Sequence, residues 1–287
     1  MLRESGFYTD SLGCIGTLAM VPRLESAQAK ISRAKEHLAL ISAEVREYLA
    51  AKPYEIAMKR DPDSRRMIYF MSTVRPTPPR IPAVVGDVIH NLRSALDHLA
   101  YQLVWTALGK PPGSHVYFPI ADSRDLYLEQ RRKQLKGAHP EAIAAVDALT
   151  PYRGANDLLW KLHKLNNVDK HRVLLTAGSA FDGVNIGPQM SRQMEKLINS
   201  MPSQKEAINI PPMDLFLRPA DRLFPLKAGD ELFIDAPDAE PDEKLQFRFG
   251  LGFGEKDIVY GDPIVETLSS MIQAIDAILP QFEKHLS

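Results

Sequence analysis

Apolar residues recur at three- and four-residue steps through much of the first half of the chain, which is the period of an amphipathic helix. The clearest example is the stretch 86–109, which divides into an apolar arc and a polar arc when residues are placed at about 100° intervals around a helix axis. The apolar arc consists of Val88, Ile89, Leu92, Ala95, Leu96, Leu99, Ala100 and Leu103. We therefore predict a helix over 86–109 with one face in a hydrophobic core.

The polar arc of this stretch is unusual in the kinds of residue that it holds. It consists of Asp87, His90, Asn91, Arg93, Ser94, Asp97, His98 and Tyr101. Lys and Glu, which normally cover a solvated helix face, are absent from it. Short side chains with directional hydrogen-bonding groups are mediocre helix formers, so gathering them here costs helix stability. This composition indicates a role other than helix formation.

The same kind of pattern predicts the remaining elements. Helical periodicity and end signals predict further helices over 24–51, 123–136, 140–149, 156–171, 190–201 and 263–285. A turn at 61–64 between two apolar runs predicts a β-hairpin over 54–59 and 67–74. Later apolar runs predict strands over 172–176, 180–186, 215–218, 231–235, 245–253 and 257–260. Four prolines predict a stiff connector over 76–82, and an acidic stretch predicts a mobile loop over 235–244.

This order of elements predicts an α+β fold. We expect a helical bundle with an inserted β-hairpin, followed by a β-rich layer and a C-terminal helix that packs back on the bundle. The expected division is a flexible N-terminal arm over 1–21 and a single interlocked domain over 22–287. Within that domain, 22–176 is mainly helical, 177–262 is β-rich and 263–287 is the terminal helix.

Composition narrows the environment and the partners. The chain has 287 residues and a formal net charge of −1, so no overall charge attracts it to nucleic acid or to an anionic membrane. Cys14 is the only cysteine, which suits a reducing compartment. No apolar run approaches the roughly 18 residues of a membrane span. We therefore expect a cytoplasmic protein with neither a membrane nor DNA as a partner.

Arg93 and His98 form an R-x4-H sequence within the predicted helix. This resembles the motif of HEPN domains, helical proteins many of which are metal-independent endoribonucleases in toxin–antitoxin and antiphage systems. The resemblance implies that Arg93 steadies an RNA phosphate and that His98 acts on the 2′-hydroxyl or the leaving oxygen. It also implies a homodimer and no cofactor. Asp97 would assist catalysis, and the supporting residues on this helix would be His90, Asn91, Ser94 and Tyr101.

A second helix adjoins this candidate site. In the stretch 156–171, His163, Asn167 and His171 follow one another at four-residue steps and share a face, with Lys170 beside them. We expect these side chains to support substrate binding. Asp169 falls near the apolar stripe, so we expect it to pair with and orient a neighbouring arginine or histidine, such as Arg93. The phrases GDVIHNLRSALDHL and LNNVDKHR also resemble bacterial and phage-associated proteins of unknown function.

Two alternatives use the same residues. The first is a metal site between the two helices, because histidine and carboxylate side chains are common metal ligands. Its ligands would be His90, Asp97, His98 and His171. The second is a buried, hydrogen-bonded seam in which the two polar faces meet each other. In that case the protein would be a binding or scaffold module that works through its β-rich part.

Overall fold

The structure is a computed structural model that describes residues 24–171, 175, 177–201, 208–211, 213–219 and 223–286. Helices and small antiparallel sheets occur together, which confirms the predicted α+β class. The expected N-terminal arm over 1–21 lies outside the described residues. So does the expected strand over 172–176, apart from Leu175.

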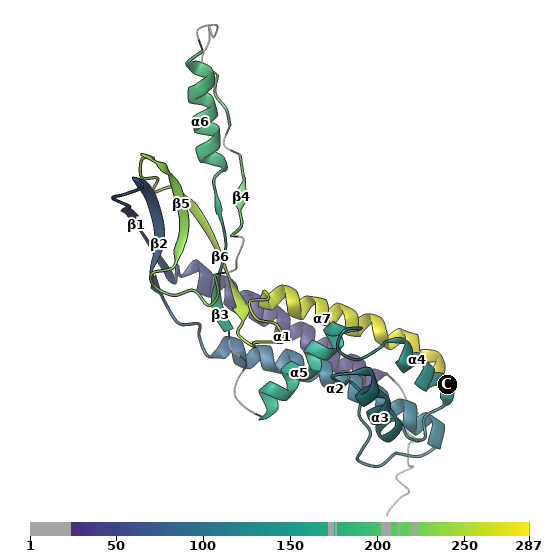
Figure 1. Cartoon of the computed structure of the whole chain (residues 1–287). Coiled ribbons are helices and arrows are strands. Elements are labelled where there is room, and N and C mark those ends of the chain that lie inside the picture. Colours follow the sequence, from purple (N-terminus) through teal and green to yellow (C-terminus); the bar gives the residue numbers. More distant parts are fainter. Residues whose placement is uncertain are drawn as a thin grey trace, which may run out of the picture.

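The helical part is an elongated bundle (Figure 1). Its elements are α1 (Glu25–Ala50), α2 (Arg80–Leu108), α3 (Arg124–Gln134), α4 (Pro140–Ala148), α5 (Asp157–His171), α7 (Ile264–Ile278) and the short 3₁₀ helix η1 (Leu279–His285). The long helices α1, α2 and α7 lie side by side and share one hydrophobic core. The C-terminal helix therefore packs back on the bundle, as predicted. Among the described residues, no helix is both long and apolar enough to cross a membrane.

The predicted stripe of α2 lies at the centre of this core. Each residue of its apolar arc is at most 1% exposed. The helix begins at Arg80 rather than at the predicted position 86, so Pro82 lies in its first turn and not in a connector. Proline is tolerated there because the first N–H groups of a helix have no intrahelical partner. Gly109 ends α2 with a φ of 65°, a conformation that glycine adopts without strain.

Two three-stranded antiparallel sheets lie at one end of the bundle (Figure 1). The predicted hairpin forms β1 (Tyr54–Arg60) and β2 (Arg66–Val74), and β5 (Glu231–Pro237) pairs with β2. The second sheet has the order β4-β3-β6, with β3 (Ala177–Asn185) between β4 (Phe216–Leu217) and β6 (Gln246–Phe253). A smaller hydrophobic cluster, which includes Met71, Phe181 and Leu232, joins the two sheets. The hairpin thus shares a sheet with a strand that lies more than a hundred residues later in the chain.

The structure differs from two predicted boundaries in the β-rich part. The stretch 257–260 is a turn and not a strand, because the Gly261 N–H donates to the Phe253 carbonyl at 2.7 Å and directs the chain back toward α7. The loop predicted over 235–244 starts later, because 235–237 belong to β5, and it contacts the hairpin. Arg60 Nη2 donates to the Ala239 carbonyl at 2.6 Å, and the Asp242 N–H donates to Tyr69 Oη at 2.8 Å.

A helical arm extends from the second sheet. The helix α6 (Gly187–Asn199) continues directly from β3, three residues before its predicted start, and the chain returns through 208–217 to reach β4. We call α6 together with the described residues of 200–217 the arm. It projects beyond both sheets, away from the bundle (Figure 1). This geometry presents α6 to solvent rather than to a core.

Candidate functional site

The polar arc of α2 does not form one continuous surface in the folded chain. Asp87 and His90 are exposed, whereas Asn91 and Arg93 are 8% and 6% exposed. The other members of the arc are partly buried, and they are Ser94, Asp97, His98 and Tyr101. The arc is divided because α5 and the segment around Phe118 pack over its middle.

Arg93 and Asp97 form a buried clasp on the backbone of Phe118. Arg93 Nη2 donates to the Phe118 carbonyl at 2.8 Å and lies 3.0 Å from Asp97 Oδ1. The same Asp97 oxygen accepts the Phe118 N–H at 2.9 Å. Phe118 is itself fully buried, so the clasp fixes the segment that follows α2 against the bundle. Arg93 is therefore not the partner of Asp169, and the histidine that lies near Asp169 is His90.

Burial shifts the pKa of each partner of the clasp away from its charged form. It lowers the pKa of the Arg93 guanidinium, and the nearby Asp97 charge acts in the opposite direction. Burial raises the pKa of Asp97, which the Arg93 charge and the Phe118 N–H counteract. Each charge is therefore tolerated mainly because the other is beside it.

His163 of α5 is the second polar group that faces Arg93. Its Nε2 is 3.1 Å from Asn167 Nδ2, which confirms that these residues stack on one face of the helix. Burial and then the charges of Arg93 and Lys164 lower the pKa of His163 to about 4. The ring is therefore neutral near neutral pH. His163 Nδ1 and Arg93 Nη1 are both buried with no hydrogen-bond partner in the described structure.

His98 faces a different element from Arg93. It hydrogen-bonds to the backbone of Ser26 in the first turn of α1, and Lys30 of the same helix is close enough to affect its titration. Burial is the main cause that lowers the pKa of His98. Positions five residues apart on a helix differ by about 140°, so packing on both sides of α2 gives Arg93 and His98 separate surroundings.

The remaining predicted residues are dispersed along the two helices. His90 Nε2 is 3.5 Å from Ser94 Oγ at the surface, and Asn91 donates to the Asp87 carbonyl at 2.8 Å. Tyr101 makes an edge-on contact with the ring of Trp105. Lys170 is exposed, and the side chain of His171 lies outside the described structure.

Asp169 of α5 lies against Gly86 near the start of α2. A Cβ atom at Gly86 would lie 2.5 Å from Asp169 Oδ1, so a larger residue there requires the Asp169 side chain to move. Burial, followed by the charge of Asp87, raises the pKa of Asp169. This residue therefore belongs to the start of α2 and not to the clasp around Arg93.

The metal-site alternative has no converging ligand set among the described residues, where no three side chains of His, Cys, Asp or Glu gather around one point. Of the expected ligands, Asp97 is engaged by Arg93 and by the Phe118 backbone. His98 faces α1, and His90 is exposed beside Ser94. These three residues therefore have separate environments.

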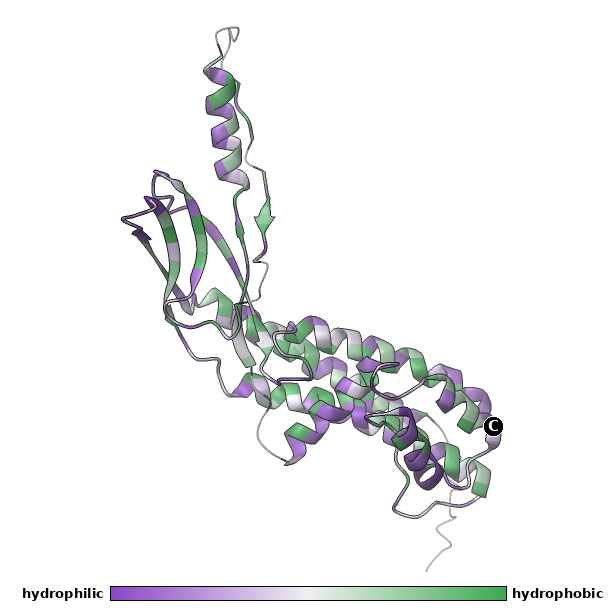
Figure 2. Cartoon of the chain, in the orientation of Figure 1, coloured by the Kyte–Doolittle hydropathy of each residue, from purple (hydrophilic) through white to green (hydrophobic). Residues whose placement is uncertain are grey.

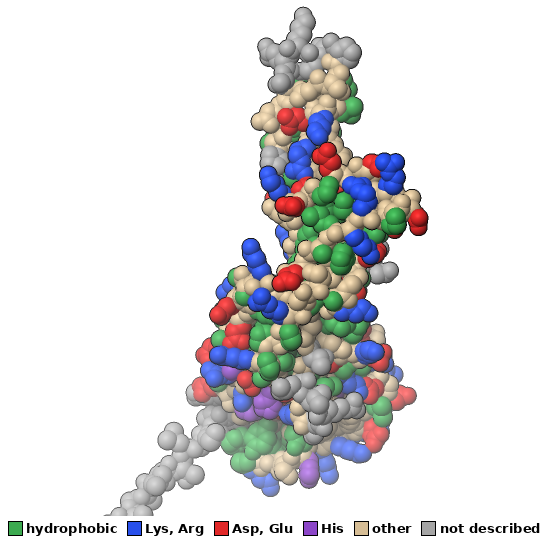
Figure 3. Space-filling model, turned by 90° about the vertical axis from the view of Figure 1, so that its left-hand side faces the viewer, with side chains coloured by type: hydrophobic (Ala, Val, Ile, Leu, Met, Phe, Trp, Pro, Cys, Tyr) green, Lys and Arg blue, Asp and Glu red, His purple; other side chains and the backbone are tan. Residues whose placement is uncertain are grey.

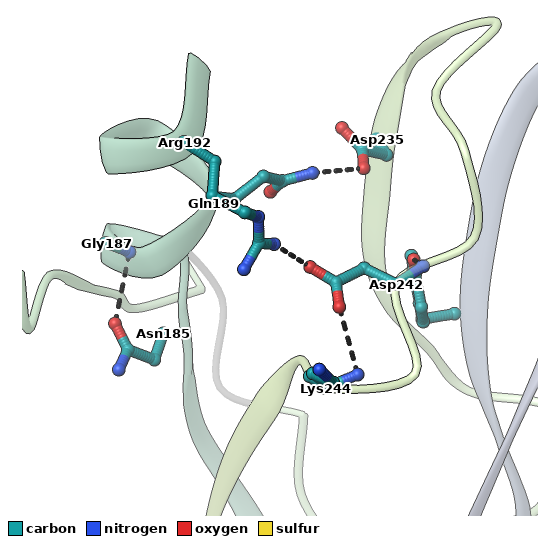
Figure 4. Close-up of polar contacts among 8 residues, drawn as sticks. Asn185, Gly187, Gln189, Arg192, Asp235, Asp242 and Lys244 are labelled. Atoms are coloured by element: carbon teal, nitrogen blue, oxygen red, sulfur yellow. Dashed lines mark hydrogen bonds and ion pairs between the residues drawn. The ribbon is translucent and has the colours of Figure 1, made fainter. Parts of the chain in front are cut away.

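Sequence analysis missed the residue that holds the base of the arm. Asn185 is 2% exposed at the end of β3. Its side-chain oxygen accepts the Gly187 N–H at 3.1 Å (Figure 4). The same oxygen accepts the Leu215 N–H at 3.1 Å, so one amide joins the outgoing and returning segments. A Cβ atom at Gly187 would lie 1.8 Å from the Met213 carbonyl oxygen, which restricts this position to glycine. Asn185 before the Gly-Pro start of α6 is a weak signal in the sequence, because its long-range partner Leu215 cannot be identified there.

Two further contacts attach α6 to the first sheet. Gln189 Nε2 donates to Asp235 Oδ2 at 2.7 Å, and Arg192 forms an ion pair with Asp242 (Figure 4). Asp242 is the residue whose N–H donates to Tyr69 of β2, so the acidic loop links the hairpin to the arm. One side of α6 is thereby fixed by polar contacts rather than by apolar packing.

We expect Arg93→Leu to lower the free energy of unfolding by about 3 kcal/mol, because it leaves the Asp97 carboxylate buried without its counter-charge. Arg93→Leu combined with Asp97→Leu should lose less than the sum of the single changes. Urea denaturation of all variants measures this. The matched control is Arg33→Leu, whose ion pair with Glu36 is exposed and should change stability by roughly 0.5 kcal/mol or less. Equal effects of Arg93→Leu and Arg33→Leu would contradict the clasp.

We expect His163 to make stability depend on pH. Its pKa is depressed from 6.5 when unfolded to about 4 when folded, so the unfolded chain binds more protons within that interval. The contribution of His163 to the free energy of unfolding is therefore fully present above pH 6.5. It is lost as the pH falls toward 4, by at most about 3 kcal/mol. Urea denaturation at several pH values gives the free energy of unfolding as a function of pH. Between pH 4 and 6.5 this free energy should change less with pH for His163→Gln than for the wild type. Identical slopes would show that His163 titrates normally.

Comparison of the chain with protein-family models, with curated proteins and with solved structures finds no match.

Proposed function

We propose that this protein is a non-enzymatic binding protein, in which the helical bundle is a scaffold and the arm carries the binding surface. The observation that supports it most directly is the burial of Arg93, which is 6% exposed and paired with Asp97 on the Phe118 backbone. We place the protein in the cytoplasm, because its single cysteine suits a reducing compartment.

The clasp disfavours phosphate binding by Arg93. An arginine that grips a phosphate needs accessible N–H donors, and those of Arg93 point into the protein interior. A phosphate at this point would also meet the carboxylate of Asp97. Opening the clasp would leave a buried charge without its partner, which is costly. The polar arc is thus better suited to fixing α2, α5 and the Phe118 segment than to holding RNA.

Exposed apolar residues are concentrated on the arm. Of the 15 large hydrophobic residues that are exposed in the described structure, eight lie on it. They are Met190, Met194, Leu197, Met201, Ile208, Met213, Leu215 and Leu217. Apolar surface gathered in this way is typical of a protein-interaction site. On the face in Figure 3, basic and acidic side chains are interspersed, so the described part of this face offers no continuous basic track for nucleic acid.

A metal-independent endoribonuclease of HEPN type, with a toxin or antiphage role, is the second candidate. The observation that favours it is the environment of His98, which is partly buried with a pKa below its ordinary value. A neutral imidazole can accept a proton near neutral pH, and Lys30 supplies a cation beside it. In this candidate, Lys30 rather than Arg93 would meet the phosphate.

The two candidates are separated by an RNA-cleavage assay on the full chain with a chelator present. We expect the wild type to cleave single-stranded RNA no faster than His98→Ala does, because Arg93 is held in the clasp and faces a different element from His98. Lys30→Ala and a DNA of the same sequence serve as controls. Cleavage that is specific to RNA and lost in a fully folded His98→Ala variant would overturn the binding-protein proposal in favour of the ribonuclease.

A further inference from the structure

One side of α6 carries an apolar stripe that remains exposed. Met190, Met194 and Leu197 lie on the helix and Met201 lies just past its end, with exposed fractions of 42%, 50%, 62% and 47%. Figure 2 shows these apolar bands on the arm, far from the core of the bundle. A single apolar residue at a surface is ordinary, whereas four at helical steps form a contact surface.

The other sides of α6 are already occupied. Ser191 Oγ accepts the Met213 N–H at 3.2 Å, and Asn199 makes two hydrogen bonds with the backbone of Ile208. These contacts place the returning segment against one side of the helix. Gln189 and Arg192 attach a second side to β5 and the acidic loop. The stripe lies on the remaining side of α6, which none of these contacts covers.

Charged residues avoid this side of the helix. At about 100° per residue, the charged positions Arg192, Glu195 and Lys196 all fall on the half of α6 that faces away from the stripe. The positions that border the stripe on its solvent side are Gln193 and Ser200, which are polar but neutral. The surface is therefore apolar at its centre and uncharged at its border.

We propose that this stripe pairs two copies of the chain, with the two α6 helices antiparallel across a two-fold axis between Met194 and Leu197. The proposal rests on the arm being the binding surface. The stripe has steps of four, three and four residues, so its pattern is the same in both directions along the helix. In the antiparallel pair, Met194 therefore faces Leu197 of the second copy, and Met190 faces Met201 of the second copy.

The uncharged border favours a second copy over a different protein. Charged residues beside an apolar helix stripe usually select a partner of opposite charge, and α6 has none there. In the proposed pair, Gln193 lies near Ser200 of the second copy, so an amide meets a hydroxyl and no like charges are opposed. Because the border of the stripe is uncharged, it can face the same border of a second copy without electrostatic repulsion.

The available area predicts a weak and reversible dimer. Burying a Leu or Met side chain completely removes on the order of 100 Å² of apolar surface from water. The four residues of the stripe are each about half exposed, so two copies of it offer at most roughly 400 Å² of apolar side-chain surface. That is below the size of stable specific interfaces, so the pairing is weak.

Sedimentation equilibrium of the full chain over the micromolar range tests this pairing. We expect a concentration-dependent dimer in the wild type and association at least roughly tenfold weaker in Leu197→Glu, which places a carboxylate in the apolar contact. Leu197 is 62% exposed, so the variant should fold normally. Leu40→Glu on α1 is the matched control, since Leu40 is also exposed, and it should associate like the wild type. A monomer at all concentrations, or equal effects of both variants, would overturn the proposal.

A mixing experiment tests the antiparallel register. Met194→Lys alone and Leu197→Glu alone should each dimerise poorly. An equal mixture should form a heterodimer, because the lysine at position 194 of one copy then faces the glutamate at position 197 of the other. A mixture as monomeric as the separate variants would overturn the register. None of these outcomes depends on cleavage of RNA, so failure of the pairing and failure of the binding-protein proposal are separately visible.

Discussion

The ion pair between Arg93 and Asp97 is the constraint on which the helical part depends. A charge in a protein interior is stable only when an opposite charge and hydrogen-bond partners surround it. Both charges here are anchored on the backbone of Phe118, so the segment after α2 must return to the same place whenever the bundle folds. The clasp thereby uses polar residues of a type common in catalytic sites to fix the packing of α2 against the Phe118 segment.

This joint changes the role that the polar residues of α2 can have. Because other helices pack on both sides of α2, Arg93 lies near His163 of α5 and His98 lies near Lys30 of α1. A shared phosphate would require both side chains to reach one point in solvent. The binding-protein proposal follows from the burial of Arg93, and the ribonuclease candidate depends on His98 acting with a cation from another helix.

Apolar residues are buried in the bundle but exposed on the arm. In α2 the apolar arc is buried against neighbouring helices, and polar groups fill the remaining contacts. In α6 the fixed sides are held by Asn185, Gln189 and Arg192, while the apolar stripe is left in solvent. A helix that is anchored by polar bonds keeps its apolar side available, which suits reversible contact with another molecule.

Local pattern was sufficient for much of the fold. The helical period predicted α1, α2 and α5, and the turn at 61–64 predicted the hairpin, because each signal depends on neighbouring residues. It also predicted which residues share a face, as His163 and Asn167 do. The start of α2 at Arg80 was missed, because the prolines before it are compatible with either a connector or a first helical turn.

Only the tertiary structure decided which face meets which partner. The backbone of Phe118 is the partner of Arg93, and Leu215 is a partner of Asn185, yet each pair is separated by more than twenty residues. The stretch 257–260 has the composition of a strand, but hydrogen bonds between Phe253 and residues 261–262 turn the chain back beside the end of β6. Hydrophobic period along a chain specifies the faces of each element, whereas the burial of a polar group depends on packing between elements that are distant in sequence.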